Sequence, residues 1–542
     1  MVRRLALVSV VVTGCVGSIT GPRPTSTGGD PARPPEPARL DCGGQHPAAT
    51  AMQRLTPTQY RNVIRDLFSG AVEASASYPG AYGRSVTGFS TEAGINAVGE
   101  QSVEQLMLAA EDVAVSLAGS LRTLLPCTTT GNRACASTFL DTYGRRAFRR
   151  PLTDEERNLL LATFDAARAD GASFTDAVAV MSAQLFQSPQ FLYLAEGESG
   201  GGRALDGYEL ASRLSFLFWG SAPDDELLNL AAAGALAERD TLLAQTRRLL
   251  ASPHADTSLA RFFREWLELD HLTAGDKSAA TYPDFTDALA RSMNESFDRT
   301  VVASVRGGET LAALMTSPST FVDASLAPLF GLTAPAGQWL KVTVAPERLP
   351  GLVGHPLPLA SHAHASSSSY VLRGRMIRLR LLCQDMPPAP GNALAQFATI
   401  PLPENPTGKE VSARVRSVAS CAGCHQQLDP AGLAFEHFDG AAHYRETYES
   451  GRPIDVSGLL ALSDGEHAFS TPAELTSALG QSAQLRQCLA RQLFRFTFSR
   501  RETDDDGCAL QALQDTIEAT GGSLEAALVA VVTTDAFTVR RD

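Results

Sequence analysis

The sequence predicts an all-α, multi-domain protein with little β-structure. Signals for helix N-termini recur along the chain, and apolar residues recur at the three- and four-residue spacing of amphipathic helices. The alternating pattern of strands is rare, and Trp339 to Val344 is its best instance. With 542 residues, of which 44% are hydrophobic, the chain is long enough for several domains with substantial cores.

Charge and composition exclude two classes of protein. The net charge is −13, from 46 Lys and Arg against 59 Asp and Glu, and only Lys277, Lys341 and Lys409 are lysines. Nucleic-acid-binding domains usually carry a basic patch, so we expect no nucleic-acid partner. The hydrophobic content is too high for an intrinsically disordered chain.

The N-terminus has the features of an export signal. Residues 1–14 hold two arginines and then the apolar run Leu5 to Val12. Val12-Thr13-Gly14-Cys15 resembles a bacterial lipobox, which implies cleavage before Cys15 and lipid on its sulfur. The alternative is an ordinary signal peptide with a chance cysteine. Residues 15–50 are rich in Pro and Gly and predict an extended tether.

These features predict a location in the cell envelope. No later stretch approaches the ~18 apolar residues of a membrane-spanning helix, so the lipid would be the only anchor. An Asp directly after the lipidated cysteine would signal retention in the inner membrane, and this position is occupied by Val16. By resemblance to bacterial lipoprotein sorting, this favours the outer membrane, facing the periplasm, over the inner membrane.

Three capped helix starts lie in the first half of the chain. Thr56 precedes Pro57 and Gln59, Thr153 forms a Thr-x-x-Glu box, and Asp206 precedes a helix with Leu205 and Leu210 as its staple. Further helices are expected at Leu259 to Leu269, Phe285 to Val305, Val371 to Leu382, Ala473 to Phe496 and Ser523 to Val532. Their aromatic stripes are typical of core packing.

Export also allows the roles of the cysteines to be predicted. Of nine cysteines, Cys15 is assigned to lipid and one pair belongs to the motif described next. Six remain: Cys42, Cys127, Cys135, Cys383, Cys488 and Cys508. An even number in an oxidising compartment predicts three disulfides. Short separations favour Cys127–Cys135 and Cys488–Cys508, which leaves Cys42–Cys383 by elimination.

The sequence Cys421-Ala422-Gly423-Cys424-His425 is the strongest functional signal. Two thiols at i and i+3 share a helix face, which suits two thioether bonds to haem vinyl groups, with His425 as proximal iron ligand. One alternative is a structural or thioredoxin-like dithiol, although the preceding Val411, Val415 and Val418 indicate helix rather than strand. The other is half of a zinc site, although the chain has no second Cys-x-x-Cys pair.

The residues from Ser420 to Asp439 resemble the haem-motif region of the planctomycete-cytochrome-c-associated family of exported proteins. Arg54 to Phe68, Arg145 to Thr153, Ser188 to Tyr193, Arg373-Gly374 and Cys488 to Phe496 resemble its other domains in the same order. The usual Ser-Pro before Arg-Gly is replaced here by Ser369-Tyr370-Val371-Leu372. The reaction of this family is not established.

These observations predict seven segments. They are the signal peptide 1–14, the tether 15–50, helical domains 51–122, 123–200 and 201–340, a cytochrome c-like haem-motif domain 341–450, and a C-terminal helical domain 451–542.

The sixth iron ligand has several candidates. No methionine follows His425, so the downstream methionine of small cytochromes c is excluded. We expect His364 first, then His362 and Met386. His437, His443 and His467, downstream of the motif, are further candidates. The alternative is an iron without a sixth protein ligand, either open or bound to water. Glu436 and Asp439 are more typical of solvated or capping residues than of an acid–base pair.

The sequence therefore predicts an exported, lipid-anchored protein with one covalent haem c. Electron transfer with a redox partner protein, as one component of an envelope oxidoreductase, is the first hypothesis. The alternatives are a helical scaffold or binding module with a structural Cys421–Cys424 pair, and a haem enzyme such as a peroxidase. No catalytic residue is assigned.

Overall fold

The structure of the chain is a computed structural model. It describes Cys42, Glu196 and residues 52–82, 85–129, 131–194, 202–269 and 271–540. The chain divides into residues 1–39 and 40–542, and every described residue belongs to the second unit. The predicted signal peptide and Cys15 lie outside the described residues, as does the predicted tether apart from Cys42.

The first part of the described chain is helical and has its own core. Its helices are α1 (Pro57–Leu67), α2 (Glu100–Leu124), α3 (Arg133–Phe139), α4 (Arg145–Phe148), α5 (Asp154–Ala169), α6 (Phe174–Gln187) and α7 (Pro189–Leu192). Between α3 and α4 the chain makes a π-helical turn, Leu140–Gly144. Buried side chains of these helices form one continuous cluster, in which α2 packs along α6.

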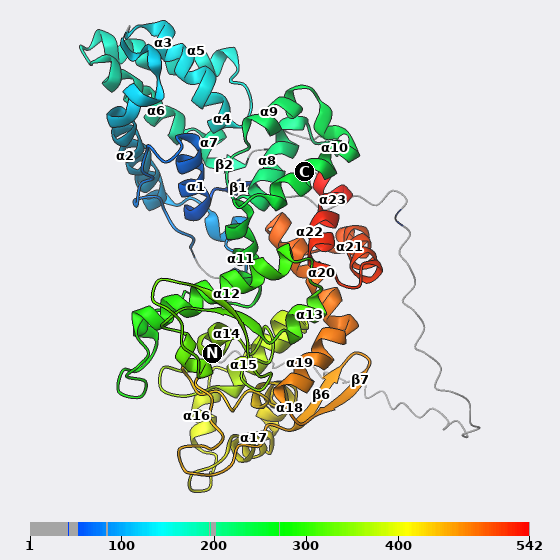
Figure 1. The fold of residues 1–542 in the computed structure, drawn as a ribbon. Helices are drawn as coiled ribbons and strands as arrows, with labels where there is room; N and C mark the ends of the chain where they lie inside the picture. The colour runs from blue at the N-terminus through cyan, green and yellow to red at the C-terminus, as the bar shows by residue number, and fades with distance from the viewer. Residues whose placement is uncertain are drawn as a thin grey trace, which may run out of the picture. The chain divides into compact units, whose positions relative to one another are not determined.

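A second, larger cluster of buried side chains joins most of the remaining helices, with no described side chain from α15, α16 or α17. The remaining helices are α8 (Gly207–Phe218), α9 (Asp225–Ala232), α10 (Arg239–Ala251), α11 (Ala255–Trp266), α12 (Asp287–Arg306), α13 (Leu311–Thr316), α14 (Pro356–Ser361), α15 (Tyr370–Arg375), α16 (Ala393–Ala398), α17 (Gly408–Arg416), α18 (Ala419–Leu433), α19 (Pro472–Gln481), α20 (Ala483–Phe498), α21 (Gly507–Ala519), α22 (Leu524–Val531) and α23 (Asp535–Thr538). Figure 1 shows α15, α17 and α18 close together.

The strands are short and few. They form four antiparallel pairs, β1 (Gln53–Arg54) with β2 (Tyr193–Leu194), β3 (Arg203–Ala204) with β8 (Val539–Arg540), β4 (Ser319–Val322) with β5 (Leu340–Thr343), and β6 (Gly458–Leu462) with β7 (Gly465–Phe469). β5 lies within the strand predicted from Trp339 to Val344. The described part of the chain is therefore mainly helical, as predicted.

The predicted helix starts are confirmed in atomic detail. The hydroxyl of Thr56 accepts a hydrogen bond from the amide of Gln59, and the side chains of Thr153 and Asp206 accept the equivalent bonds at the starts of α5 and α8. In all three helices the side chain of the third residue also accepts a bond from the backbone amide of the capping residue. Two predicted helices have a different form. The run from Ala473 to Phe496 is broken at Ser482, which caps α20, and α15 continues into a π-helical turn, Met376–Leu381.

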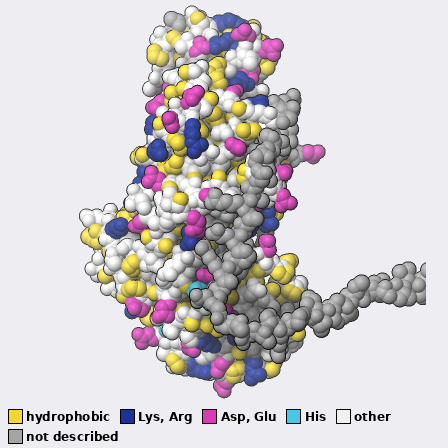
Figure 2. Space-filling model, turned by 90° about the vertical axis from the view of Figure 1, so that its right-hand side faces the viewer, with side chains coloured by type: hydrophobic (Ala, Val, Ile, Leu, Met, Phe, Trp, Pro, Cys, Tyr) yellow, Lys and Arg dark blue, Asp and Glu magenta, His cyan; other side chains and the backbone are white. Residues whose placement is uncertain are grey.

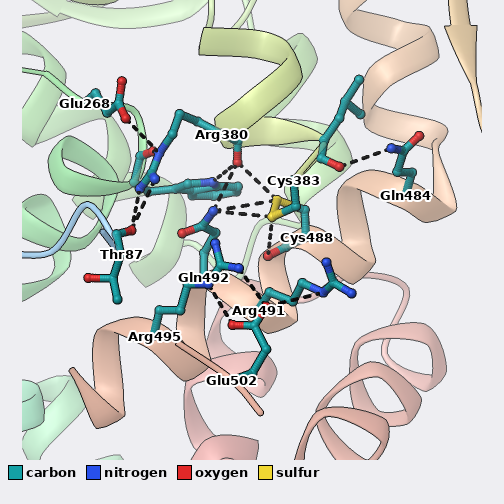
Figure 3. The surroundings of a disulfide bond; sticks show 12 residues. Thr87, Glu268, Arg380, Cys383, Gln484, Cys488, Arg491, Gln492, Arg495 and Glu502 are labelled. Atoms are coloured by element: carbon teal, nitrogen blue, oxygen red, sulfur yellow. Dashed lines mark hydrogen bonds and ion pairs between the residues drawn. A yellow bond between two sulfur atoms is a disulfide. The ribbon is translucent and has the colours of Figure 1, made fainter. Parts of the chain in front are cut away.

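The disulfides correct part of the sequence prediction. Cys127 pairs with Cys135 as expected, but Cys383 pairs with Cys488, and Cys42 pairs with Cys508. The predicted pairs Cys488–Cys508 and Cys42–Cys383 are wrong. Figure 3 shows the Cys383–Cys488 bond against the carbonyl of Arg380 and the amide of Gln492.

The reason for the wrong pairing is the geometry of α20 and α21. These helices pack together, and the chain between them runs from Ser499 to Asp506. Cys508 is therefore at the start of α21, whereas Cys488 lies ten residues before the end of α20. Ten helical residues span about 15 Å, while a disulfide needs Cα atoms within about 7 Å.

The described surface carries charges of both signs. Acidic and basic side chains are interspersed over the described part of the face in Figure 2. None of the described helices combines the length and the apolar character needed to cross a bilayer.

Candidate functional site

The Cys-x-x-Cys-His motif occupies the first turns of α18. α17 ends at Arg416 and α18 begins at Ala419 after a break at Val418, so the motif opens a new helix. Cys421 and Cys424 are half-buried and are the free cysteines among the described residues. The helical setting predicted for the motif is confirmed, with both thiols on one side of a helix.

Close contact between two backbones holds α18 in place. A Cβ built on Gly432 would lie 1.7 Å from the carbonyl oxygen of Tyr370, and one built on Gly374 would lie 2.1 Å from the carbonyl oxygen of Leu428. No side chain fits at either position. The two glycines therefore let α15 and α18 cross in direct backbone contact.

Two buried arginines next to this crossing bind the carbonyls of the α18 region. Arg373 donates to the carbonyls of Phe435 and Phe438 at 2.8 Å each, and to Asp439 at 2.7 Å. Burial lowers the pKa of Arg373 to about 10. Arg378 donates to the carbonyl of Gln427 at 2.8 Å. Arg373 therefore holds the chain just beyond the C-terminal end of α18, and Arg378 holds the helix itself.

The imidazole of His425 is fixed by a buried carboxylate. Its Nδ1 lies 2.9 Å from Oδ1 of Asp429, one turn later on α18. Asp429 has no exposed surface, and its Oδ2 accepts a 2.6 Å hydrogen bond from the hydroxyl of Ser412 on α17. A carboxylate acceptor places the proton of His425 on Nδ1, which leaves the lone pair on Nε2 for a metal ion.

A segment with exposed apolar side chains adjoins the motif. Ser420 donates a 3.1 Å hydrogen bond to the side-chain oxygen of Gln396 on α16. On the same segment, the side chains of Phe397 and Leu402 are 43% and 38% exposed. Two free thiols, an imidazole with a free lone pair and apolar side chains close by form a donor set and surroundings that fit a covalent haem.

The predicted sixth ligand His364 is exposed, in a loop whose Ser368 hydroxyl donates to Glu436 at 3.3 Å. Glu436 follows the C-terminal end of α18 and comes eleven residues after His425. The ring of His362 is buried and bonded to the carbonyl of Leu267 at 2.8 Å. Met386 is half-buried in the segment that leads into α16.

The downstream histidines have other partners. Nδ1 of His437 lies 2.8 Å from the carbonyl oxygen of Arg445, and His467 binds Asp464. His443 lies between Asp439 and Asp284, and the hydrogen bond that its ring donates to the carboxylate of Asp439 raises the pKa of His443. Among the described residues no group of three His, Cys, Asp or Glu side chains could hold a metal ion.

Asp439 and Glu436, which the sequence analysis weighed as an acid–base pair, have structural roles. Oδ1 of Asp439 caps the following turn by accepting from the backbone amides of Ala441 and His443. Glu436 is buried beside Arg445, at 3.5 Å, and so is not solvated as one of the sequence-based alternatives held.

Asp429 and Ser412 are site residues that the sequence analysis missed. The spacing of four between His425 and Asp429 was a usable signal, because residues i and i+4 share a helix face. Ser412 gave no local signal, since it reaches Asp429 through the packing of α17 on α18.

Comparison with known proteins identifies five domains. Family models, each described as a protein of unknown function, match residues 53–118 (DUF1587), 135–196 (DUF1595), 205–332 (DUF1592), 349–448 (DUF1588) and 465–537 (DUF1585). No curated protein and no solved structure matches the chain. Residues 421–425 lie within the DUF1588 match. The five matched domains are of the planctomycete cytochrome c-associated type, and their presence in this order supports the resemblance of the chain to that family.

Proposed function

We propose that this chain is an exported c-type haem protein that transfers electrons to or from a partner protein. The observation that carries the proposal is the arrangement on α18, where two free thiols precede a histidine whose Nδ1 is bound to a buried carboxylate. Cys421 and Cys424 would form the thioether bonds, and Nε2 of His425 would bind the iron. The bound haem would supply a one-electron couple.

The residues around His425 hold the imidazole in one orientation and one tautomer. Asp429 keeps the proton on Nδ1, and Ser412 fixes the carboxylate through its second oxygen. Because Asp429 is fully buried, its charge is screened little by water and increases the electron donation of the ring. This favours the oxidised state of a metal bound at Nε2.

A haem enzyme such as a peroxidase is the second candidate function. The same carboxylate supports it, since strong electron donation from a proximal ligand favours bond cleavage in a bound oxidant. The scaffold hypothesis requires a structural Cys421–Cys424 pair, and the structure leaves both thiols free. Turnover of peroxide and binding of exogenous ligands distinguish an enzyme from an electron carrier.

The pyridine haemochrome assay tests the proposal. The full chain, exported in a host that attaches c-type haem, should retain haem through denaturing electrophoresis, and Cys421→Ser/Cys424→Ser should lose it. The matched control is Cys127→Ser/Cys135→Ser, which removes another closely spaced cysteine pair without touching α18. Absence of haem from the wild type, or its retention in the α18 variant, would refute the proposal.

For the location we propose a lipid anchor on Cys15 in the outer membrane. The lipobox-like sequence before Cys15 supports this, as does the lack of a spanning helix in the described residues. Cys42 is bonded to Cys508, so only residues 16–41 separate the lipid from a covalent attachment to α21. Cys15→Ser should move the protein to the soluble envelope fraction, and unchanged membrane fractionation would contradict the proposal.

A further inference from the structure

A small cavity lies between segments that are far apart in the sequence. Its walls come mainly from β1, β2, α8, α11, the end of α20, α23 and β8. Figure 1 shows β1 and β2 beside α8. Four of the five family matches contribute residues to it. Its volume is about 70 Å³, which is room for roughly five water molecules.

The cavity combines aromatic walls with an excess of positive charge. Phe216, Phe496, Phe498 and Phe537 provide aromatic surface. The charged residues in the lining are Arg149, Arg213, Arg261, Arg540, Glu196 and Glu209. Four arginines against two glutamates leave two positive charges in excess, in a chain whose net charge is −13. Such a balance attracts an anion.

Two of the arginines are not matched by a close carboxylate hydrogen bond. The guanidinium of Arg149 is buried, donates to backbone carbonyls such as that of Phe191, and has its pKa lowered to about 10 by burial and then by Arg150. Nη1 of Arg261 is buried and makes no hydrogen bond within the described structure, and its contact with Glu265 is 3.5 Å.

The lining of the cavity holds a second group without a hydrogen-bond partner, besides Nη1 of Arg261. The guanidinium of Arg261 lies over the ring of Phe496 at 4.5 Å, and the buried hydroxyl of the following residue, Thr497, also has no hydrogen-bond partner in the described structure. Buried polar atoms without partners cost free energy, so a ligand that satisfies both would be stabilised. Glu265 is occupied by Ser90, which donates to both of its oxygens.

We propose that this cavity binds a small organic carboxylate. The carboxylate accepts hydrogen bonds from Nη1 of Arg261 and from the hydroxyl of Thr497, and the apolar body of the ligand packs on the phenylalanine rings. Arginine suits this role because its planar guanidinium matches the carboxylate geometry. The mainly apolar lining and the small volume select a short-chain acid over a phosphate ester. This site is independent of the haem proposal.

Titration calorimetry with propionate, on the full exported chain, tests the site. We expect Arg261→Gln to weaken binding at least tenfold and Thr497→Val at least threefold, because each removes one donor to the carboxylate. Arg264→Gln is the matched control on the same helix; Arg264 pairs with Asp298 and does not line the cavity, so its variant should bind as the wild type does. Thermal unfolding of each variant confirms that it is folded.

Three comparisons complete the test. 1-Propanol and inorganic phosphate should bind at least tenfold more weakly than propionate, and equal binding of either would overturn the proposal. Propionate should bind equally well to Cys421→Ser/Cys424→Ser, which separates this site from ligation of a haem iron. No propionate binding by the wild type, or undiminished binding by both cavity variants, would also refute it.

Discussion

Gly374 and Gly432 face each other where α15 crosses α18, and a Cβ added to Gly432 would lie 2.9 Å from the backbone nitrogen of Gly374. The same Cβ would lie still closer to the carbonyl of Tyr370. This contact fixes the helix that carries the Cys-x-x-Cys-His motif against the helix whose arginines bind its carbonyls. The position of the candidate site therefore depends on two residues without side chains.

The first prediction concerns this crossing. Gly432→Ala should reduce the free energy of unfolding by about 1–3 kcal/mol or more, because the helices must move apart to admit a methyl group. The control is Gly423→Ala on the same helix, where a Cβ would meet nothing within 4 Å. That variant should be neutral or more stable by up to about 1 kcal/mol. Equal denaturant midpoints for the two variants would contradict the role of Gly432.

The second prediction concerns pH and a buried histidine. Nδ1 of His355 accepts a hydrogen bond from the amide of Leu357 and caps α14, and burial lowers the pKa of His355 from 6.5 to about 3. The unfolded chain therefore binds a proton at this histidine below pH 6.5, whereas the folded chain binds it only near pH 3. The contribution of His355 to stability is complete above pH 6.5 and decreases as the pH falls, by about 1.4 kcal/mol per unit.

His355→Asn provides the comparison, because asparagine also caps helices but does not titrate in this range. Urea unfolding at pH 7 and pH 5 should show a smaller loss of stability in the variant than in the wild type. The difference should approach 2 kcal/mol, since pH 5 lies 1.5 units below the pKa of the unfolded histidine. Parallel losses in the two proteins would mean that protonation of His355 does not oppose folding.

The third prediction concerns Asp429. Asp429→Asn keeps a hydrogen-bond acceptor for His425 but removes the negative charge, so the reduction potential of the haem protein should rise. Tenfold weaker preference for the oxidised state corresponds to about 59 mV for a one-electron couple, and we expect a shift of that order. Asp464→Asn is the control, because Asp464 pairs with His467 on an exposed turn. A potential that is unchanged in Asp429→Asn would exclude the proposed electronic role.

The fourth prediction concerns the sixth ligand. The loop that holds His364 bonds to Glu436, which lies beyond the C-terminal end of α18, so we expect an unchanged spectrum in His364→Ala. Met386 lies in the segment that contacts the motif through Gln396, so Met386→Ala should convert a low-spin spectrum to high-spin. The opposite pattern would restore His364 as the ligand. A high-spin wild type would indicate that the protein supplies no sixth ligand.

The helix starts and the setting of the motif were predictable because their signals are local. The cap at Thr56 depends on a residue three positions later, and the shared face of Cys421 and Cys424 follows from helical periodicity alone. Cys127–Cys135 was predictable for a related reason, since only eight residues separate the two cysteines. Asp429 belongs with these, since its spacing from His425 is also local.

The remaining features depend on how distant helices pack. Helix length and the direction of α21 place Cys488 near Cys383 and Cys508 near Cys42, which no separation along the chain could indicate. Packing of α17 on α18 brings Ser412 to Asp429, and five chain segments meet to surround Arg261. The sequence alone determined which residues form helices and which carry the candidate chemistry. Only the tertiary structure decided which of them meet, because contacts between helices follow from the shapes of entire surfaces.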